Sequence, residues 1–331
     1  MKMPLILLVL AMLCTSCTAL PAEERAFAVA LFVEREGNLW RVYGRIPTYQ
    51  SSGGYLTVAG EGETMAAAVN AMSAAAPMHM HLSQLRLLVA AEEVAESEDL
   101  AEVLRYFAEQ SDMRQDCMVA VCDVQGETLM NALTPSAGER LSKAVDVLLD
   151  TRIEQGRILP ARLSDVVRNG TRQSAVLIAM TLRNGKPELS GGYPLTLEKR
   201  AVGAISSGET QMLALLCGNA KSMQITLGDV SAEVRLTSVK KGLDLAAKEA
   251  GAELTLHLVN GTDQAAFLEQ ELAAECARLL TKLYASGCDV MGLGHKAICR
   301  FRDMEDWNAL NWPGQVRQIR WTVSVRITSP A

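Results

Sequence analysis

The sequence predicts an α+β fold of several domains, with mixed sheets and packed helices, and with antiparallel strands in the C-terminal half. The chain has 331 residues, 49% of them hydrophobic, which is enough for about two domains with sizeable cores. Residues 55–124 alternate between apolar strand-like and helical segments, as in an α/β core. After residue 208, apolar residues alternate singly, which is typical of antiparallel strands with one solvated face.

The elements of the N-terminal half follow from apolar periodicity and from turn residues. Residues 27–40 and 43–47 are predicted strands about a turn at residues 36–38. Further strands are predicted at residues 55–60, 85–91, 116–124 and 175–182, and the last of these has a hairpin partner after Asn184-Gly185. Helices are predicted from after Thr64 to Pro77, at residues 92–109, and at residues 141–155 with an end at Gly156.

The C-terminal half is predicted to form an antiparallel sheet with one long helix. Its antiparallel strands are predicted at residues 223–227, 232–239 and 253–259, and a further alternating strand is predicted at residues 320–328. Residues 267–286 are the longest predicted helix, with Gly287 as its cap. We place a domain boundary near residue 190, in a loop at Gly191-Gly192, which divides the chain after its leader into domains 17–190 and 191–331.

The first residues predict export and a lipid anchor. Lys2 precedes a nine-residue apolar run at residues 5–13, which is too short to span a bilayer and is typical of a signal peptide. The run ends in Cys14-Thr-Ser-Cys17, which resembles a bacterial lipobox with residues 1–16 as the signal peptide. Diacylglycerol on the Cys17 thiol, together with an acyl group on the α-amine that cleavage exposes, would anchor the protein stably. Two or more lipid chains are enough to hold a protein on a bilayer. The alternative is an ordinary signal peptide in which Cys17 is incidental.

The remaining cysteines and the overall charge limit the chemistry further. Export permits disulfides, but six thiols allow 15 pairings, and no zinc-type Cys/His spacing occurs. We interpret these thiols as free and buried, with Cys117 and Cys122 on opposite faces of one strand. With 32 basic and 38 acidic residues, a net charge of −6, the chain gives no support to a nucleic-acid binder.

The motifs of common catalytic and ligand sites are incomplete in this sequence. The segments at residues 60–63 and 292–295 lack the third glycine of a dinucleotide fingerprint and the Gly-Lys-Ser/Thr of a P-loop, so both are interpreted as turns. His79 and His81 share a strand face but have no third ligand nearby in sequence. There is no Gly-x-Ser-x-Gly elbow, and pairs of acidic residues occur where carboxylates usually face water. The sequence therefore favours a non-enzymatic protein without cofactor or metal.

Several segments, in order, resemble the Ger(x)C spore-germination lipoproteins, the C subunits of germinant receptors. They are Cys17 after the apolar run, Val-Ala-Gly-Glu-Gly-Glu-Thr at 58–64 with its Ala-rich helix, the strand and helix start at 81–95, Leu-Arg-Tyr-Phe at 104–107 with Met113-Arg114, Asp-Val-Met-Gly-Leu-Gly at 289–294, Trp307 with Asn311-Trp312, and the closing strand at 323–328. The sequence departs from the family where Thr18 replaces a common Trp and where Val290 replaces the usual Pro.

The resemblance implies a mixed α/β fold and a non-catalytic subunit in nutrient-triggered germination. Similar proteins are tethered by lipid to the extracytoplasmic face of the inner spore membrane. There they accompany a multi-spanning A-type subunit and a permease-like B-type subunit. Trp307 and Asn311-Trp312 are either core residues, which is the commoner case, or partner-facing anchors. The alternative function is a solute-binding lipoprotein that holds a small ligand between its two halves.

Overall fold

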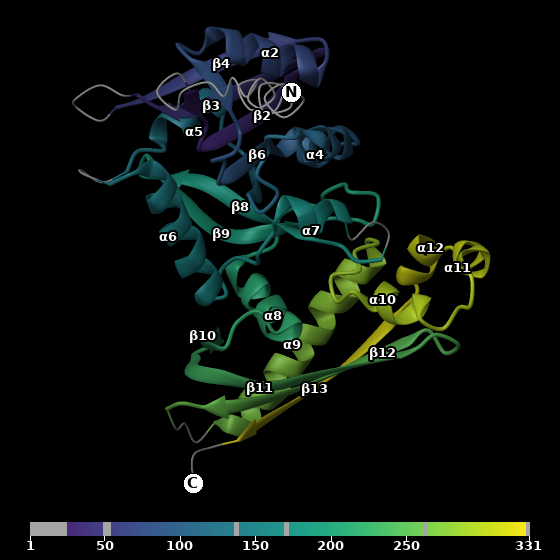
Figure 1. Ribbon diagram of the computed structural model, residues 1–331. Helices are drawn as coiled ribbons and strands as arrows, with labels where there is room; N and C mark the ends of the chain where they lie inside the picture. Colours follow the sequence, from purple (N-terminus) through teal and green to yellow (C-terminus); the bar gives the residue numbers. More distant parts are fainter. Residues whose placement is uncertain (1–24, 49–53, 136–138, 169–171, 261–263, 329–331) are drawn as a thin grey trace, which may run out of the picture.

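The computed structural model describes residues 25–48, 54–135, 139–168, 172–260 and 264–328. It contains a seven-stranded sheet in the N-terminal part of the chain and a four-stranded sheet in the C-terminal part, with helices packed on both (Figure 1). The mixed α+β fold class predicted from the sequence is confirmed.

The seven-stranded sheet is parallel at its centre and antiparallel at both edges. Strand β2 is parallel to β6, β6 to β7 and β7 to β8, whereas β3, β4 and β9 join through antiparallel pairs. In spatial order the strands are β4 (Tyr55–Gly62), β3 (Leu39–Pro47), β2 (Ala30–Glu36), β6 (Leu87–Ala91), β7 (Met118–Cys122), β8 (Val176–Arg183) and β9 (Lys186–Pro194). A separate short pair joins β1 (Arg25–Phe27) to β5 (His79–His81).

Two of the predicted hairpins are confirmed by their turn residues. Gly37 joins β2 to β3 with a φ of 61°, which a glycine adopts without strain. Asn184 and Gly185 join β8 to β9 with φ values of 53° and 72°, the conformation of a primed hairpin turn. Strand β4, predicted to open an α/β unit, instead lies at the antiparallel edge, and the parallel ladder runs through β2, β6, β7 and β8.

Helices cover both faces of this sheet. Helix α2 (Met65–Ala75) lies over Gly44 and Gly60, while α5 (Gly126–Ala132) packs on Phe32 and Tyr43 of the opposite face. The remaining helices of this part are α3 (Glu92–Ala95), α4 (Asp99–Glu109), α6 (Leu141–Glu154) and α7 (Leu163–Arg168). The predicted helix at 92–109 is thus two helices, because the segment between them turns at Glu96 and Ser97.

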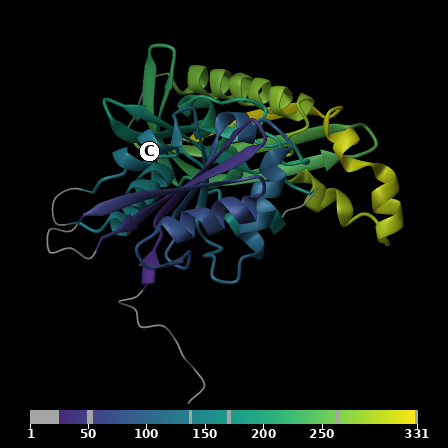
Figure 2. The ribbon, with the colours of Figure 1, turned by 90° about the horizontal axis from the view of Figure 1, so that it is seen from above.

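The four-stranded sheet carries one long helix on its apolar face. Strands β10 (Ser222–Leu227), β11 (Val230–Asp244) and β12 (Glu249–Leu258) are antiparallel neighbours, and β13 (Arg320–Thr328) adds parallel to β12. The apolar stripe of α9 (Ala265–Ala285) is buried as predicted. Seen from above, α9 runs along one side of the molecule and the segment of α10 (Leu293–Ile298), α11 (Met304–Leu310) and α12 (Trp312–Val316) projects at one end (Figure 2).

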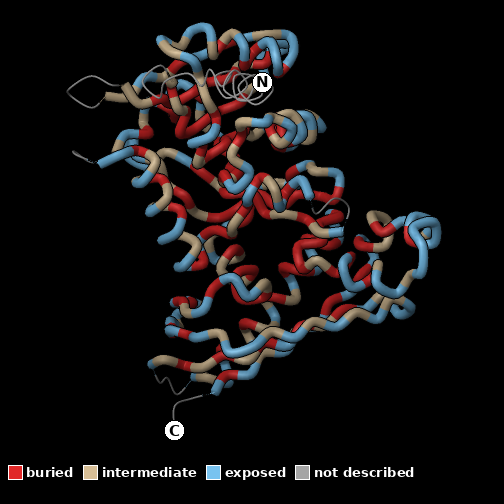
Figure 3. Tube along the Cα trace, in the orientation of Figure 1, coloured by how far each residue is buried: buried red, intermediate tan, exposed pale blue. Residues whose placement is uncertain are grey.

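The two sheets are joined by α8 (Ser207–Cys217), which contacts β9 on one side and β11, β12 and α9 on the other. Ser206 and Glu209 form a capping box that fixes the start of this helix. Buried residues form two clusters, one in each part (Figure 3). The boundary predicted at residue 190 stays a prediction, but Gly191 and Gly192, placed in a loop by the sequence, lie within β9.

Candidate functional site at the junction of the two sheets

The predicted lipidation residue, Cys17, lies outside the described residues, so its modification stays a prediction. His79 and His81 lie on β5, where His81 Nδ1 is 3.9 Å from Asp112 Oδ2. Within the described ranges, no group of three His, Cys, Asp or Glu side chains is placed to hold a metal ion. In the same part of the chain, no helix is long and apolar enough to span a bilayer.

The glycine segment at residues 60–63 is not the turn that the sequence predicted. Gly60 and Gly62 lie in β4, and α2 packs directly on them: a Cβ at Gly60 would stand 2.0 Å from the Met72 nitrogen. The glycines therefore permit a close approach of helix to strand. The prediction that Thr64 caps α2 is confirmed, since its side chain accepts a hydrogen bond from the Ala67 amide at 3.2 Å.

The tryptophans near the C terminus are core residues, and the partner-facing alternative is wrong. Trp307 is 4% exposed and Trp312 is 2% exposed, and their ring centroids are 5.9 Å apart. Both belong to the buried cluster of the C-terminal part. Trp312 also has a polar contact that the sequence did not suggest, because its indole nitrogen is directed at Asp289.

Asp289 is a buried carboxylate that accepts four hydrogen bonds. Its Oδ1 accepts from the Tyr284 hydroxyl at 2.5 Å and from the Leu293 amide at 2.8 Å, and its Oδ2 accepts from the Gly294 amide at 2.7 Å and from Trp312 Nε1 at 3.2 Å. The carboxylate thus joins the end of α9 to the start of α10 and to α12. Burial raises the pKa of Asp289, and the four donors oppose that shift.

The backbone of Asp289 connects this group to the N-terminal part of the chain. The Asp289 amide donates to Ser174 Oγ at 2.9 Å, and the Ser174 amide donates to the Asp289 carbonyl at 2.9 Å. Ser174 is buried just before β8. Gly294 lies against the Arg172 carbonyl, where a Cβ would stand 2.5 Å from that oxygen. The segment 289–294 is therefore a structural connection between the two sheets.

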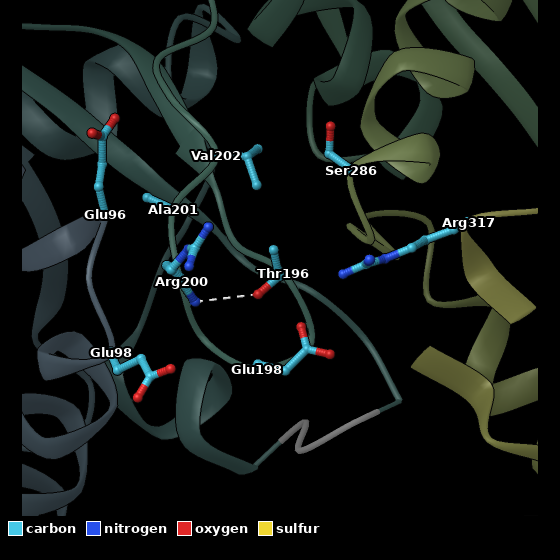
Figure 4. A pocket seen from close by; sticks show the side chains of 9 residues that line it. All are labelled: Glu96, Glu98, Thr196, Glu198, Arg200, Ala201, Val202, Ser286 and Arg317. Atoms are coloured by element: carbon cyan, nitrogen blue, oxygen red, sulfur yellow. Dashed lines mark hydrogen bonds between the residues drawn. The ribbon is translucent and has the colours of Figure 1, made fainter. Parts of the chain in front are cut away.

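A cavity of about 680 Å³ lies at the same junction, which we call the junction cavity (Figure 4). Its walls come from the α3–α4 connection, from the segment after β9, from the end of α9 and from the residue after α12. Five charged residues contribute to its lining: Glu96, Glu98, Glu198, Arg200 and Arg317. Its volume falls in the range of small-molecule sites, which often lie between domains.

The segment 195–201 forms one wall of the junction cavity and is fixed to both parts of the chain. The Ala201 amide donates to the Ala95 carbonyl at 2.8 Å in the N-terminal part, and the Leu197 amide donates to the Gly287 carbonyl at 3.3 Å after α9. Thr196 closes the segment on itself, because its hydroxyl accepts from the Arg200 amide at 3.3 Å. The backbone of this wall is therefore fixed by hydrogen bonds to both parts of the chain.

Lys199 is strained at the tip of this segment. Its φ is 68°, in the left-handed region that a lysine rarely adopts. Its Nζ is buried without a hydrogen-bond partner among the described residues, and burial lowers the pKa of Lys199 to about 8. Strained and unpaired groups of this kind are often found at functional sites.

Arg317 forms the opposite wall and lies over a glycine. Gly287 has a φ of 84°, and a Cβ there would meet Arg317 Nε at 3.1 Å. The glycine therefore both caps α9 and leaves room for the guanidinium. The sequence predicts Gly287 as a cap but gives no signal for the residues that line the cavity, because no motif connects positions that lie about a hundred residues apart.

Comparison with known proteins identifies the family. A family model described as "Spore germination protein N-terminal domain" matches residues 19–182. A solved structure titled "Crystal Structure of the GerBC protein" shares the fold with a TM-score of 0.55 at 13% identity, over 91% of this chain and 97% of that one. Among curated proteins, the comparison found no match. The chain belongs to the Ger(x)C family of spore germination proteins.

Proposed function

We propose that this protein is a non-catalytic, membrane-anchored lipoprotein subunit of a spore germinant receptor. The observation that carries the proposal is the match of residues 19–182 to the germination-protein domain. The likeness of the whole fold to the GerBC protein supports it, because it extends across both sheets.

The anchor in this proposal is Cys17, acylated after removal of residues 1–16. The short apolar run before it and the Cys-Thr-Ser-Cys segment support this assignment. Lipid chains on Cys17 would hold the folded part on the extracytoplasmic face of the inner spore membrane. There it would assemble with the multi-spanning A-type and permease-like B-type subunits.

The chemistry of Asp289 supports a structural role for the folded part. All four of its hydrogen bonds come from protein groups within one junction, so the carboxylate is committed to holding elements together. A general base or nucleophile needs a lone pair directed at a substrate. A scaffold, in contrast, needs a rigid connection between its parts, and the Asp289–Ser174 bonds supply one.

Metabolic labelling with a palmitate analogue tests the anchor. The wild-type chain and Cys14→Ala are expected to be labelled and to sediment with membranes, whereas Cys17→Ala is expected to carry no label. Cys14→Ala is the matched control because it removes the neighbouring thiol of the same segment. Equal label in the Cys17→Ala variant would contradict the proposal.

Affinity purification tests the assembly. The tagged, acylated chain, solubilised in mild detergent from spores, is expected to bring down large multi-spanning membrane proteins. The Cys17→Ala chain is the control, since loss of the anchor lowers its concentration at the membrane. Absence of any multi-spanning partner from the wild-type preparation would refute the scaffolding role.

A further inference from the structure

A groove of about 640 Å³ lies between the end of α2 and strand β5, and we call it the β5 groove. It is lined by Ser73, Ala74 and residues 76–80. Strand β1 pairs in parallel with β5, and Arg25, the first described residue, lies opposite His79. The described chain therefore begins beside the groove.

The lining of the β5 groove is uncharged and largely apolar. Among the described residues, no Asp, Glu, Lys or Arg contributes to it, whereas five charged residues line the junction cavity. Met78 and Met80 pack against the N-terminal core with one part of each side chain and are half-buried. The hydroxyl of Ser73 donates a hydrogen bond of 2.9 Å to the Val69 carbonyl, so this polar group is satisfied within α2.

The length of the chain before Arg25 limits which side of the fold can reach a bilayer. Cys17 precedes Arg25 by eight positions. An extended chain advances at most about 3.6 Å per residue, so a lipid on Cys17 holds Arg25 within about 30 Å of the membrane. A folded chain of this length has a diameter of about 50 Å, which exceeds that reach. Helix α2 lies at the opposite end of the molecule from the four-stranded sheet (Figure 1). The tether therefore keeps the side that carries the β5 groove near the bilayer.

The side chains at the β5 groove suit the boundary between lipid headgroups and acyl chains. Methionine is flexible and fits irregular apolar surroundings, and histidine combines an apolar ring with polar nitrogens. Arg25 adds a cation beside His79, and anionic headgroups attract cations. Contact of this kind is weak by itself, but a lipid anchor nearby gives the groove a high effective concentration at the membrane.

We propose that the β5 groove rests on the bilayer, with residues 76–80 in contact with the headgroups and the upper parts of the acyl chains. The inference rests on the lipid anchor at Cys17 and adds to it the face that the folded part turns to the membrane. In this orientation the four-stranded sheet is held away from the bilayer, because it lies at the far end of the molecule from α2 (Figure 1).

Quenching of tryptophan fluorescence by brominated lipids tests this orientation. The acylated full-length chain is reconstituted in vesicles of phosphatidylcholine and phosphatidylglycerol with bromine on the acyl chains. Ala74→Trp places the probe at the groove, and Ala309→Trp is the matched control. Both alanines are exposed and each is the residue before the last of its helix, α2 or α11, so neither change disturbs a core.

The Ala74→Trp variant is expected to be quenched at least about twofold more than the Ala309→Trp variant, because only the groove reaches the acyl region. The unsubstituted chain gives the baseline, since its own Trp40, Trp307, Trp312 and Trp321 are buried. Equal quenching of the two variants in chains that float with the vesicles would overturn the inference and leave the anchor intact. Chains that do not float would contradict the anchor, and the inference with it.

A change of charge at the groove gives a second test in the Ala74→Trp background. His79→Glu is expected to lower the quenching at least about twofold, because a carboxylate is repelled by anionic headgroups. His79→Lys should preserve the quenching, and His295→Glu, at an exposed histidine of α10, is the matched control. Circular dichroism confirms that each variant is folded. Quenching that stays unchanged in His79→Glu would also overturn the inference.

Discussion

The indole nitrogen of Trp312 donates a hydrogen bond of 3.2 Å to the carboxylate of Asp289, 23 residues earlier, with both side chains buried. The same carboxylate accepts hydrogen bonds from the Leu293 and Gly294 amides at the start of α10. One side chain therefore connects α9, α10 and α12 of the C-terminal part. Its backbone reaches across to Ser174. The two sheets therefore meet at a polar centre surrounded by apolar packing, which makes their relative position specific.

Replacement of Asp289 by Asn is expected to lower the free energy of unfolding by about 2–4 kcal/mol. The amide of Asn offers one acceptor oxygen and directs its own donors at groups that are themselves donors. Urea unfolding followed by tryptophan fluorescence measures the loss, since Trp307 and Trp312 are buried near the site.

The control for this change is Asp306→Asn, an exposed acid in the first turn of α11. It is expected to change the free energy of unfolding by less than about 0.5 kcal/mol. If the two variants lost equal stability, the four hydrogen bonds of Asp289 would not be the source of its effect.

Replacement of Gly60 by Ala is expected to lower stability by at least about 2 kcal/mol, because the new methyl group would overlap the backbone of α2. Gly242→Ala in β11 is the control, since a Cβ there meets nothing within 4 Å. That change should alter stability by less than about 1 kcal/mol. Thermal unfolding by circular dichroism compares the two, and a neutral Gly60→Ala would show that α2 does not need the close approach.

Thiol reactivity is expected to separate Cys299 from the other cysteines of the described chain. Cys299 is exposed, whereas Cys117, Cys276 and Cys288 are buried and burial raises the pKa of each to about 12. Maleimide labelling of the native protein near neutral pH should modify Cys299 first, and Cys299→Ser should remove that fast phase. Thiols that stay unlabelled after denaturation without reductant would instead indicate a disulfide.

Much of the fold could be predicted because local signals and tertiary packing agree. The hairpin at Asn184-Gly185, the buried strand β6 and the stripe of α9 each follow from turn chemistry or apolar period, and each is present. Gly60 was misinterpreted because a glycine in a turn and a glycine under a helix look alike in sequence. Only the packing of α2 separates the two cases.

The junction could not be predicted from the sequence for a different reason. Asp289 was singled out only as part of a family segment, and its partners Ser174 and Trp312 lie far from it along the chain. The cavity is lined by both Glu98 and Arg317, which lie far apart in the chain and which the periodicity of a single helix or strand cannot bring together. Polar contacts between distant segments depend on how the elements pack, and apolar periodicity carries no information about them.

The buried ammonium of Lys199 is expected to make stability depend on pH in the alkaline range. Burial lowers its pKa from 10.5 to about 8, so between these values the unfolded chain holds a proton that the folded chain has released. This contribution therefore destabilises the fold below about pH 8, by on the order of 3 kcal/mol, and disappears as pH rises to 10.5. Lys199→Met should accordingly be more stable than wild type near pH 7, with the difference closing at about pH 10.

Urea midpoints of the wild type and of Lys199→Met across this pH range measure the difference in stability, with Lys186→Met at an exposed position as the control. A gain for Lys199→Met that stays constant with pH would assign the effect to packing rather than to the buried charge.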